Sequence, residues 1–230
     1  MQGGGGQHAN FCVANVALIE PQVRFTAMAL ERGFAVFLPD SSERVTDVNG
    51  QLCGKTWDDE VRAAPNLDVP FLEALLINVI PSLRPADEKR EVFFTGLSSG
   101  GHMTVRAATR LGDRRNVFGI FFDNETRRNI SEVGACLSAQ YPNEKPWEAL
   151  AGGARPPWRA FLHAQDGIHD RSCVEKVRRQ LAQRGDPETV PFRLEAASRS
   201  ADLHYWLDAY NAPLLDFFGQ FCVGTGCPRR

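Results

Sequence analysis

The chain has 230 residues, of which 43% are hydrophobic and 23% charged, and this composition is typical of one globular domain with a substantial core. Its 26 basic and 28 acidic side chains give a net charge of −2, so no basic surplus is available to neutralise phosphates and we expect no nucleic-acid partner. No apolar run approaches the ~20 residues of a membrane-spanning helix, so we expect no membrane-embedded segment.

The N-terminal part of the chain begins with a predicted helix. Residues Pro21–Arg32 have helical spacing and end at a glycine. The apolar run Phe34–Leu38 predicts a short buried strand. Residues Ser41–Glu60 are polar and without period, which predicts a loop. Apolar side chains then recur at helical spacing from Leu72 to Leu83, which predicts a second helix.

Strand and helix signals alternate through the rest of the chain. This alternation predicts an α/β fold with a mostly parallel sheet and helices on both faces, formed by residues 1–230 as a single domain. Further helices are predicted from Met103 to Leu111, from Val174 to Leu181, and from near Pro213 onward. The predicted strands are Glu91–Thr95, Val117–Phe122, Trp158–Leu162 and Pro191–Leu194.

One motif carries a specific chemistry. Gly96-Leu97-Ser98-Ser99-Gly100 matches G-x-S-x-G between a predicted strand and a predicted helix, which is the setting of a nucleophile elbow. Glycines are needed there because the turn is strained and a Cβ would crowd its neighbours. Ser98 is the predicted nucleophile, and the Ser99 backbone N–H is a predicted oxyanion donor. The competing interpretation is a glycine-rich turn with no catalytic role.

A serine nucleophile needs a base and an acid. In this arrangement the chain order is Ser, acid, His, and His204 alone among the five histidines lies between the last strand and the terminal helix. Asp166 and Asp170 both follow the preceding strand. Asp170 stands just before a helix, where an N-cap accounts for it, so we prefer Asp166 as the acid. Asp123, after an earlier strand, ranks third.

A second oxyanion donor is predicted in the glycine run at the start of the chain. The run Gly3–Gly6, represented by Gly4, offers unhindered backbone N–H groups that can approach a substrate oxygen closely. A flexible tail or linker is the alternative interpretation.

At these residues the chain resembles the poly(3-hydroxybutyrate) depolymerase and feruloyl esterase-like branch of the α/β-hydrolases. The resemblance implies an α/β-hydrolase fold, ester hydrolysis through an acyl-enzyme, and no cofactor or metal. It runs through Asp68-Val69-Pro70-Phe71-Leu72, the Gly-Leu-Ser-Ser-Gly-Gly elbow, His163 before the acid loop, and His204 followed by an aromatic residue.

The chain departs from that family in two ways. Family members usually have His-Gly at the end of the acid-bearing strand and the Asp four places after the His, whereas this chain has His163-Ala164 and places Asp166 one residue earlier. In related proteins a strand, and two more before it, precede the glycine loop. Here the loop begins at Gly3, so we predict an α/β-hydrolase domain that lacks its N-terminal strands and is N-terminally truncated.

The substrate class is therefore a small or polymeric carboxylic ester. The alternatives are a serine peptidase of the prolyl oligopeptidase type and an inactive hydrolase relic that acts as a binding protein.

The six cysteines lack the paired spacing of a zinc site, although Cys222 and Cys227 are close enough in sequence to form a disulfide. The sequence does not determine where the protein is located. Two N-glycosylation tripeptides, at Asn124 and Asn129, favour an extracellular location. The sequence does not indicate an oligomeric state.

Overall fold

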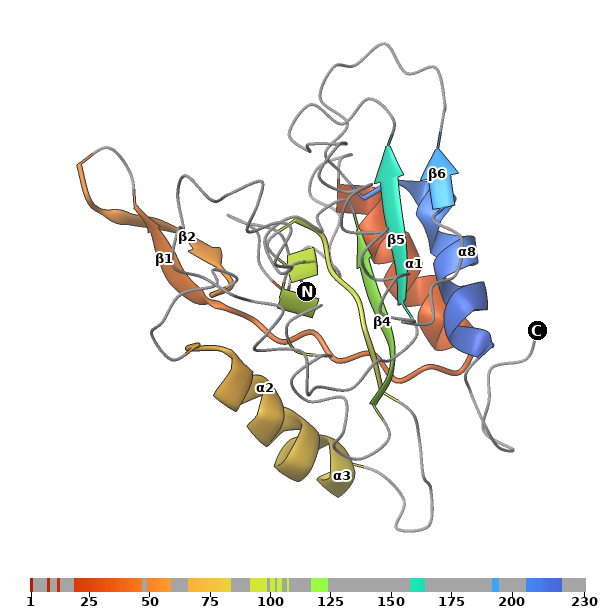
Figure 1. Cartoon of the computed structure of the whole chain (residues 1–230), viewed down its shortest axis with the longest axis horizontal. Helices are drawn as coiled ribbons and strands as arrows, with labels where there is room; N and C mark the ends of the chain where they lie inside the picture. Colours follow the sequence, from red (N-terminus) through yellow and green to blue (C-terminus); the bar gives the residue numbers. More distant parts are fainter. Residues whose placement is uncertain are drawn as a thin grey trace, which may run out of the picture.

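A computed structural model gives the arrangement of the chain (Figure 1). The helix predicted from Val174 to Leu181, the cysteines Cys222 and Cys227, and the tripeptides at Asn124 and Asn129 lie outside the residues that the structure describes. The described residues are Met1, His8, Cys12, 19–46, 49–58, 66–83, 92–98, 100–101, 103–104, 107, 117–123, 158–163, 192–194 and 206–220.

A four-stranded parallel sheet runs through the molecule. Its order is β3-β4-β5-β6, so strands that follow one another in the chain are also neighbours in the sheet. The four strands predicted from Glu91 onward are all present, with ends shifted by no more than one residue. The strands are β3 (Val92–Phe94), β4 (Val117–Asp123), β5 (Trp158–His163) and β6 (Phe192–Leu194).

Two helices from opposite ends of the chain pack together beside this sheet (Figure 1). They are α1 (Glu20–Glu31) and α8 (Asp208–Gly219), and α8 also contacts β6. Phe93 of β3 stacks on Phe218 of α8 with ring centroids 4.6 Å apart. The shared core contains Phe25, Ala29, Leu97, Trp206, Tyr210, Leu214, Leu215, Phe217 and Phe218.

Ion pairs cross the exposed side of the same two helices. The Arg24 guanidinium donates to both carboxylate oxygens of Asp208, at 2.6 and 2.5 Å, and Arg32 donates to Asp216 at 2.6 Å. Solvent-exposed pairs of this kind contribute only about 0–1 kcal/mol each. The apolar core, rather than these ion pairs, therefore holds α1 against α8.

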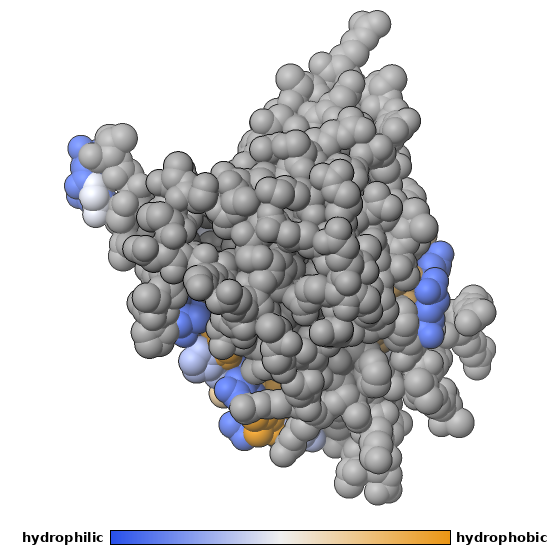
Figure 2. Space-filling model, viewed as in Figure 1, coloured by the Kyte–Doolittle hydropathy of each residue, from blue (hydrophilic) through white to orange (hydrophobic). Residues whose placement is uncertain are grey.

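A second helical segment combines three elements: α2 (Val69–Ala74), a π-helical turn η3 (Leu75–Val79) and α3 (Ile80–Ser82). The helix predicted here is present, but its apolar face is not buried as a whole. Leu72 and Ile80 are buried, whereas Val79 and Leu83 are 45% and 66% exposed. No residue of the π turn itself is buried, so burial is confined to Leu72 and Ile80 on either side of it. Figure 2 shows hydrophobic surface over this segment.

Two of the predicted elements were wrong. Phe34–Leu38 is not a strand: Phe34, Val36 and Leu38 pack against the core, but no strand of the described part pairs with them. The predicted loop Ser41–Glu60 contains an antiparallel hairpin, β1 (Ser42–Thr46) and β2 (Leu52–Thr56). Its turn includes Gly50 at φ 80°, a conformation that favours glycine.

The last helix begins at Asp208 and not near Pro213. Leu207 has extended φ and ψ and forms the N-cap, while Asp208 stands in the first turn, where a carboxylate interacts favourably with the helix dipole. Pro213 therefore lies inside the helix. The loss of its backbone N–H is offset by the burial of Leu214 and Phe217 just beyond it.

No helix in the described part of the chain is both long and apolar enough to cross a membrane.

The α1–α8 core yields a stability prediction. Phe217 has no exposed surface, so we expect Phe217→Ala to lower the free energy of unfolding by about 3–5 kcal/mol. Leu30 lies on α1 and is 56% exposed, so Leu30→Ala serves as the control and should stay within about 0.5 kcal/mol. Urea denaturation measures both changes, and equal effects of the two substitutions would contradict the assignment of the core.

Candidate functional site

The turn after β3 holds the predicted nucleophile in an uncommon backbone conformation. Ser98 has φ 55°, and it is the one non-glycine residue with positive φ among those described. This left-handed conformation costs of order 1 kcal/mol or more for a residue with a Cβ. Residues held in it are concentrated at functional sites, where the surrounding structure maintains the strain.

The close approach of two glycines makes this turn sharp. A Cβ added to Gly96 would lie 2.4 Å from the carbonyl oxygen and 2.5 Å from the carbonyl carbon of Gly100. The Gly100 N–H donates to the Leu97 carbonyl at 2.9 Å, and the Thr104 hydroxyl donates to the Gly100 carbonyl at 2.8 Å. The chain therefore reverses direction from strand to helix within a few residues, around Ser98.

The turn is anchored on both sides by buried residues. Leu97 belongs to the α1–α8 core, while Met103, Thr104 and Ala107 follow in helical conformation with no exposed surface. Ser98 itself is partly exposed. The turn thus holds its hydroxyl-bearing residue at the surface on a rigid base, as a serine nucleophile requires.

The first residue of the chain lies against this turn. The Met1 amino group donates to the Thr95 carbonyl, and the Leu97 N–H donates to the Met1 carbonyl at 3.2 Å. This pair of bonds is the pattern of a parallel strand bonded around Gly96, two residues beyond the end of β3. Burial lowers the pKa of the Met1 amino group to about 5. The run Gly3–Gly6, which includes the predicted oxyanion donor Gly4, begins two residues further along the chain and lies outside the described residues.

Beyond the glycine run, Asp40 binds two further parts of the chain. The His8 backbone N–H donates to Oδ1 of Asp40 at 3.3 Å, and the His8 ring Nδ1 lies 3.0 Å from Oδ2. The Lys55 ammonium of β2 also donates to Oδ2. Burial acts to raise the pKa of the Asp40 carboxyl, but the hydrogen bonds from Lys55 and His8 outweigh it and leave that pKa below its usual value. Asp40 was not among the predicted site residues.

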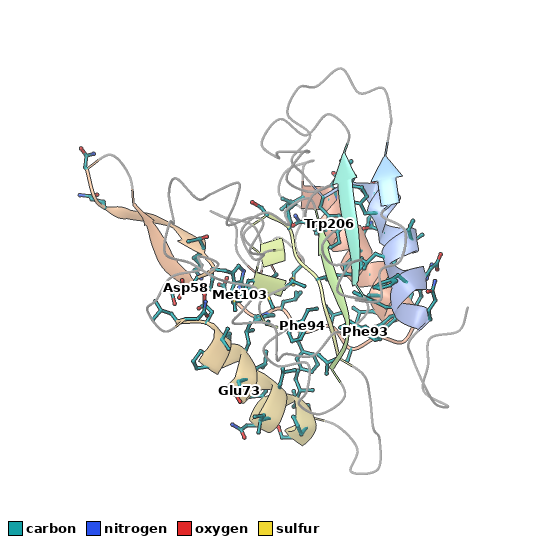
Figure 3. All side chains as sticks on the ribbon, in the orientation of Figure 1. Asp58, Glu73, Phe93, Phe94, Met103 and Trp206 are labelled. Atoms are coloured by element: carbon teal, nitrogen blue, oxygen red, sulfur yellow. The ribbon has the colours of Figure 1, made fainter. Side chains whose placement is uncertain are left out.

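Two buried carboxylates near α2 accept hydrogen bonds from backbone N–H groups. The Asp58 N–H donates to Asp68 Oδ2 at 2.6 Å, and the Leu67 N–H donates to Asp58 Oδ2 at 2.7 Å. The Asn66 carboxamide oxygen accepts from the N–H groups of Asp68 and Val69, at 3.0 and 2.8 Å, at the start of α2. In Figure 3, Asp58 lies between the hairpin and α2. These contacts shape the turn, so we assign Asp58 and Asp68 a structural role.

The predicted acids Asp166 and Asp170, the base His204 and the oxyanion donor Ser99 lie outside the described residues. Some of them are close in sequence to described residues. β5 ends at His163, three residues before Asp166, and Trp206 stands two residues after His204. Because carboxyl ends of parallel strands meet at one sheet edge, the segments after β3, β5 and β6 leave from the same edge. Asp123 ends β4 at this edge too.

Comparison of the chain with protein-family models, with curated proteins and with solved structures gave no match. In the described part, no three His, Cys, Asp or Glu side chains gather in a way that could hold a metal ion. The interpretation of the site therefore depends on the geometry around Ser98.

This geometry predicts the effect of a single methyl group. Gly96→Ala places a Cβ against the Gly100 carbonyl, so we expect a loss of about 1–3 kcal/mol in unfolding free energy, the usual cost of overpacking. Gly219, at the end of α8, has no neighbour within 4 Å of an added Cβ, so Gly219→Ala should be neutral or slightly stabilising. Thermal unfolding of both variants tests the prediction, and an unchanged Gly96→Ala variant would contradict the close approach.

A second prediction concerns Asp40 and pH. A carboxyl group whose pKa is lowered on folding contributes stability above its unfolded pKa, 3.8 here, and this contribution is lost as the pH falls through the folded pKa. Asp40→Asn should therefore have a lower Tm than the parent at neutral pH, and the gap should close below about pH 4. Asp216→Asn, in the exposed pair with Arg32, is the control and should show a smaller gap. A gap for Asp40→Asn that persists or widens in acid would contradict the proposed ion pairs.

Proposed function

We propose that this chain is a serine hydrolase of the α/β-hydrolase fold that cleaves carboxylic esters. The observation that carries the proposal is the conformation of Ser98, a non-glycine residue at φ 55° in a turn whose Gly96 has no room for a Cβ. A glycine-rich turn without catalytic function would place glycine at the position with positive φ. Here a serine takes the strained position, directly between a parallel strand and a helix.

In the proposed mechanism, His204 accepts the proton of the Ser98 hydroxyl as its oxygen attacks the ester carbonyl carbon. The carbonyl oxygen becomes an oxyanion that the Ser99 N–H and a glycine-run N–H, from Gly4, stabilise. His204 then gives the proton to the departing alcohol, which leaves the acyl group on Ser98. Water, deprotonated by His204, hydrolyses this acyl-enzyme and restores the serine.

Asp166 is proposed to orient His204 and to stabilise the imidazolium that forms, with Asp170 as the alternative. The sheet supports this set of roles, because the segments after β3, β5 and β6 carry nucleophile, acid and base in the order Ser, Asp, His. The position of Met1 supports the proposed role of the glycine run, since Met1 bonds to Thr95 and Leu97 and the run begins two residues later in the sequence.

The substrate is proposed to be a small or polymeric carboxylic ester. The reaction as written needs only the side chains, two backbone N–H groups and water, so the proposal includes no cofactor.

The decisive experiment is covalent labelling together with substitution of the nucleophile. A fluorophosphonate should label the intact protein once, at Ser98, and Ser98→Ala should remove labelling and lower kcat on a p-nitrophenyl ester by about 10³-fold or more. Ser82→Ala, which changes an exposed hydroxyl of α3, is the control and should keep both.

Three outcomes of this experiment would change the proposal. Labelling elsewhere, or full activity in Ser98→Ala, would overturn the assignment of the nucleophile. Hydrolysis of an aminoacyl amide in preference to the ester would favour a peptidase of the prolyl oligopeptidase type. Absence of both labelling and turnover would favour an inactive relic that acts as a binding protein.

A further inference from the structure

Gly100 makes three close contacts around the turn that holds Ser98. Its N–H donates to the Leu97 carbonyl at 2.9 Å, and its carbonyl accepts a hydrogen bond from the Thr104 hydroxyl at 2.8 Å. The same carbonyl faces Gly96, where an added Cβ would lie 2.4 Å from its oxygen and 2.5 Å from its carbon. The backbone of Gly100 therefore connects the end of the strand segment, the turn and the helix that follows.

The hydrogen bond from Thr104 is buried. Thr104 has no exposed surface, and Gly100 is buried as well. Thr104 stands four residues after Gly100 in the same helical segment. A hydrogen bond prefers a narrow range of directions, so the hydroxyl fixes the direction of the Gly100 carbonyl. Because the bond is buried, water does not readily replace the hydroxyl when it is removed.

The direction of this carbonyl bears on the conformation of Ser98. The bond between Gly100 and Leu97 closes a four-residue turn in which Ser98 is the second residue, at φ 55°. A strained conformation of this kind persists only where the surrounding contacts enforce it. If the Gly100 carbonyl could rotate away from Gly96, the turn could open and Ser98 could relax to negative φ. The Thr104 hydroxyl opposes that rotation.

We propose that Thr104 is a positioning residue for the nucleophile: its hydroxyl holds the Gly100 carbonyl against Gly96 and so keeps Ser98 in its left-handed conformation. This inference rests on the proposed function and deepens it by adding a residue that is fully buried and so cannot touch a substrate. Threonine hydroxyls in helices often bond the carbonyl four residues earlier without any part in catalysis. A bond of that ordinary kind would affect stability alone.

The test compares Thr104→Val, which keeps the branched shape without the hydroxyl, with Thr104→Ser, which keeps the hydroxyl. The measurements are kcat/KM for a p-nitrophenyl ester and the rate constant of fluorophosphonate labelling at Ser98, both well below each Tm. Thr104→Val should lower both by about 10-fold or more, because misplacement of a reacting group by about 1 Å can cost on the order of 100-fold. Thr104→Ser should recover most of the loss. Labelling should still reach completion in both variants.

Thr26→Val is the matched control. The Thr26 hydroxyl of α1 donates to the Gln22 carbonyl, also four residues earlier, at 3.3 Å. The substitution removes the same kind of bond from a helix that does not contain the turn, so both rates should match those of the parent. If Thr104→Val loses no more of either rate than Thr26→Val, or if Thr104→Ser is as slow as Thr104→Val, Thr104 is not a positioning residue.

The outcomes for this inference and for the proposed function are separable. If the parent protein is neither labelled at Ser98 nor active on the ester, the proposed function fails and the positioning role fails with it. If the parent is labelled and active while Thr104→Val keeps both rates, only the positioning role fails. Should Thr104→Val not fold, Thr104→Ala takes its place, because it differs from Thr104→Ser by one hydroxyl. Equal rates in these two variants would overturn the positioning role.

Discussion

The contact between Gly96 and the Gly100 backbone is the constraint on which the candidate site depends. A Cβ on Gly96 would lie 2.4 Å from the Gly100 oxygen, so no side chain fits at the residue that leads into the turn. The turn can therefore be tight enough to force Ser98 to positive φ. The strain is local, and the residues that maintain it are the buried Leu97 on one side and Met103, Thr104 and Ala107 on the other.

The second organising feature is that residues far apart in the sequence are joined by backbone and charged contacts. Met1 binds the carbonyl of Thr95 and the N–H of Leu97. His8 and Lys55 share the carboxylate of Asp40.

The sequence predicted the sheet well because buried parallel strands are continuous apolar runs, as in Val117–Phe122, and because such runs differ clearly from their polar surroundings. It also predicted a sharp turn after the Glu91–Thr95 strand, where Gly96 has a direct steric reason. The hairpin was missed because polar residues such as Glu43 and Lys55 gave it no apolar period, although Asn49-Gly50 is a typical hairpin turn. The dipeptide Asn49-Gly50 was therefore the one sequence feature named here that could have predicted the hairpin.

Other features of the fold and of the candidate site depend on contacts between distant residues, which the spacing of residues in the sequence does not predict. Phe34–Leu38 has the continuous apolar run of a buried strand, but a strand also needs a neighbouring strand, and no local pattern predicts one. Proline favours the first helical turn and so points to Pro213 as the start of α8, whereas the bond from Arg24 to Asp208 and the core behind Tyr210 extend the helix backward. Asp40 was missed for the same reason, since its partner His8 lies 32 residues away.

The α1–α8 core has a consequence for how the proposed site would respond to heat. Leu97, next to the proposed nucleophile in the sequence, and Trp206, two residues from the proposed base, are members of the same buried cluster. A cluster of this kind opens as one cooperative unit, so Leu97 and Trp206 should lose their packing together. On warming, the temperature at which the proposed ester hydrolysis ends and the temperature at which the fold melts should therefore be the same.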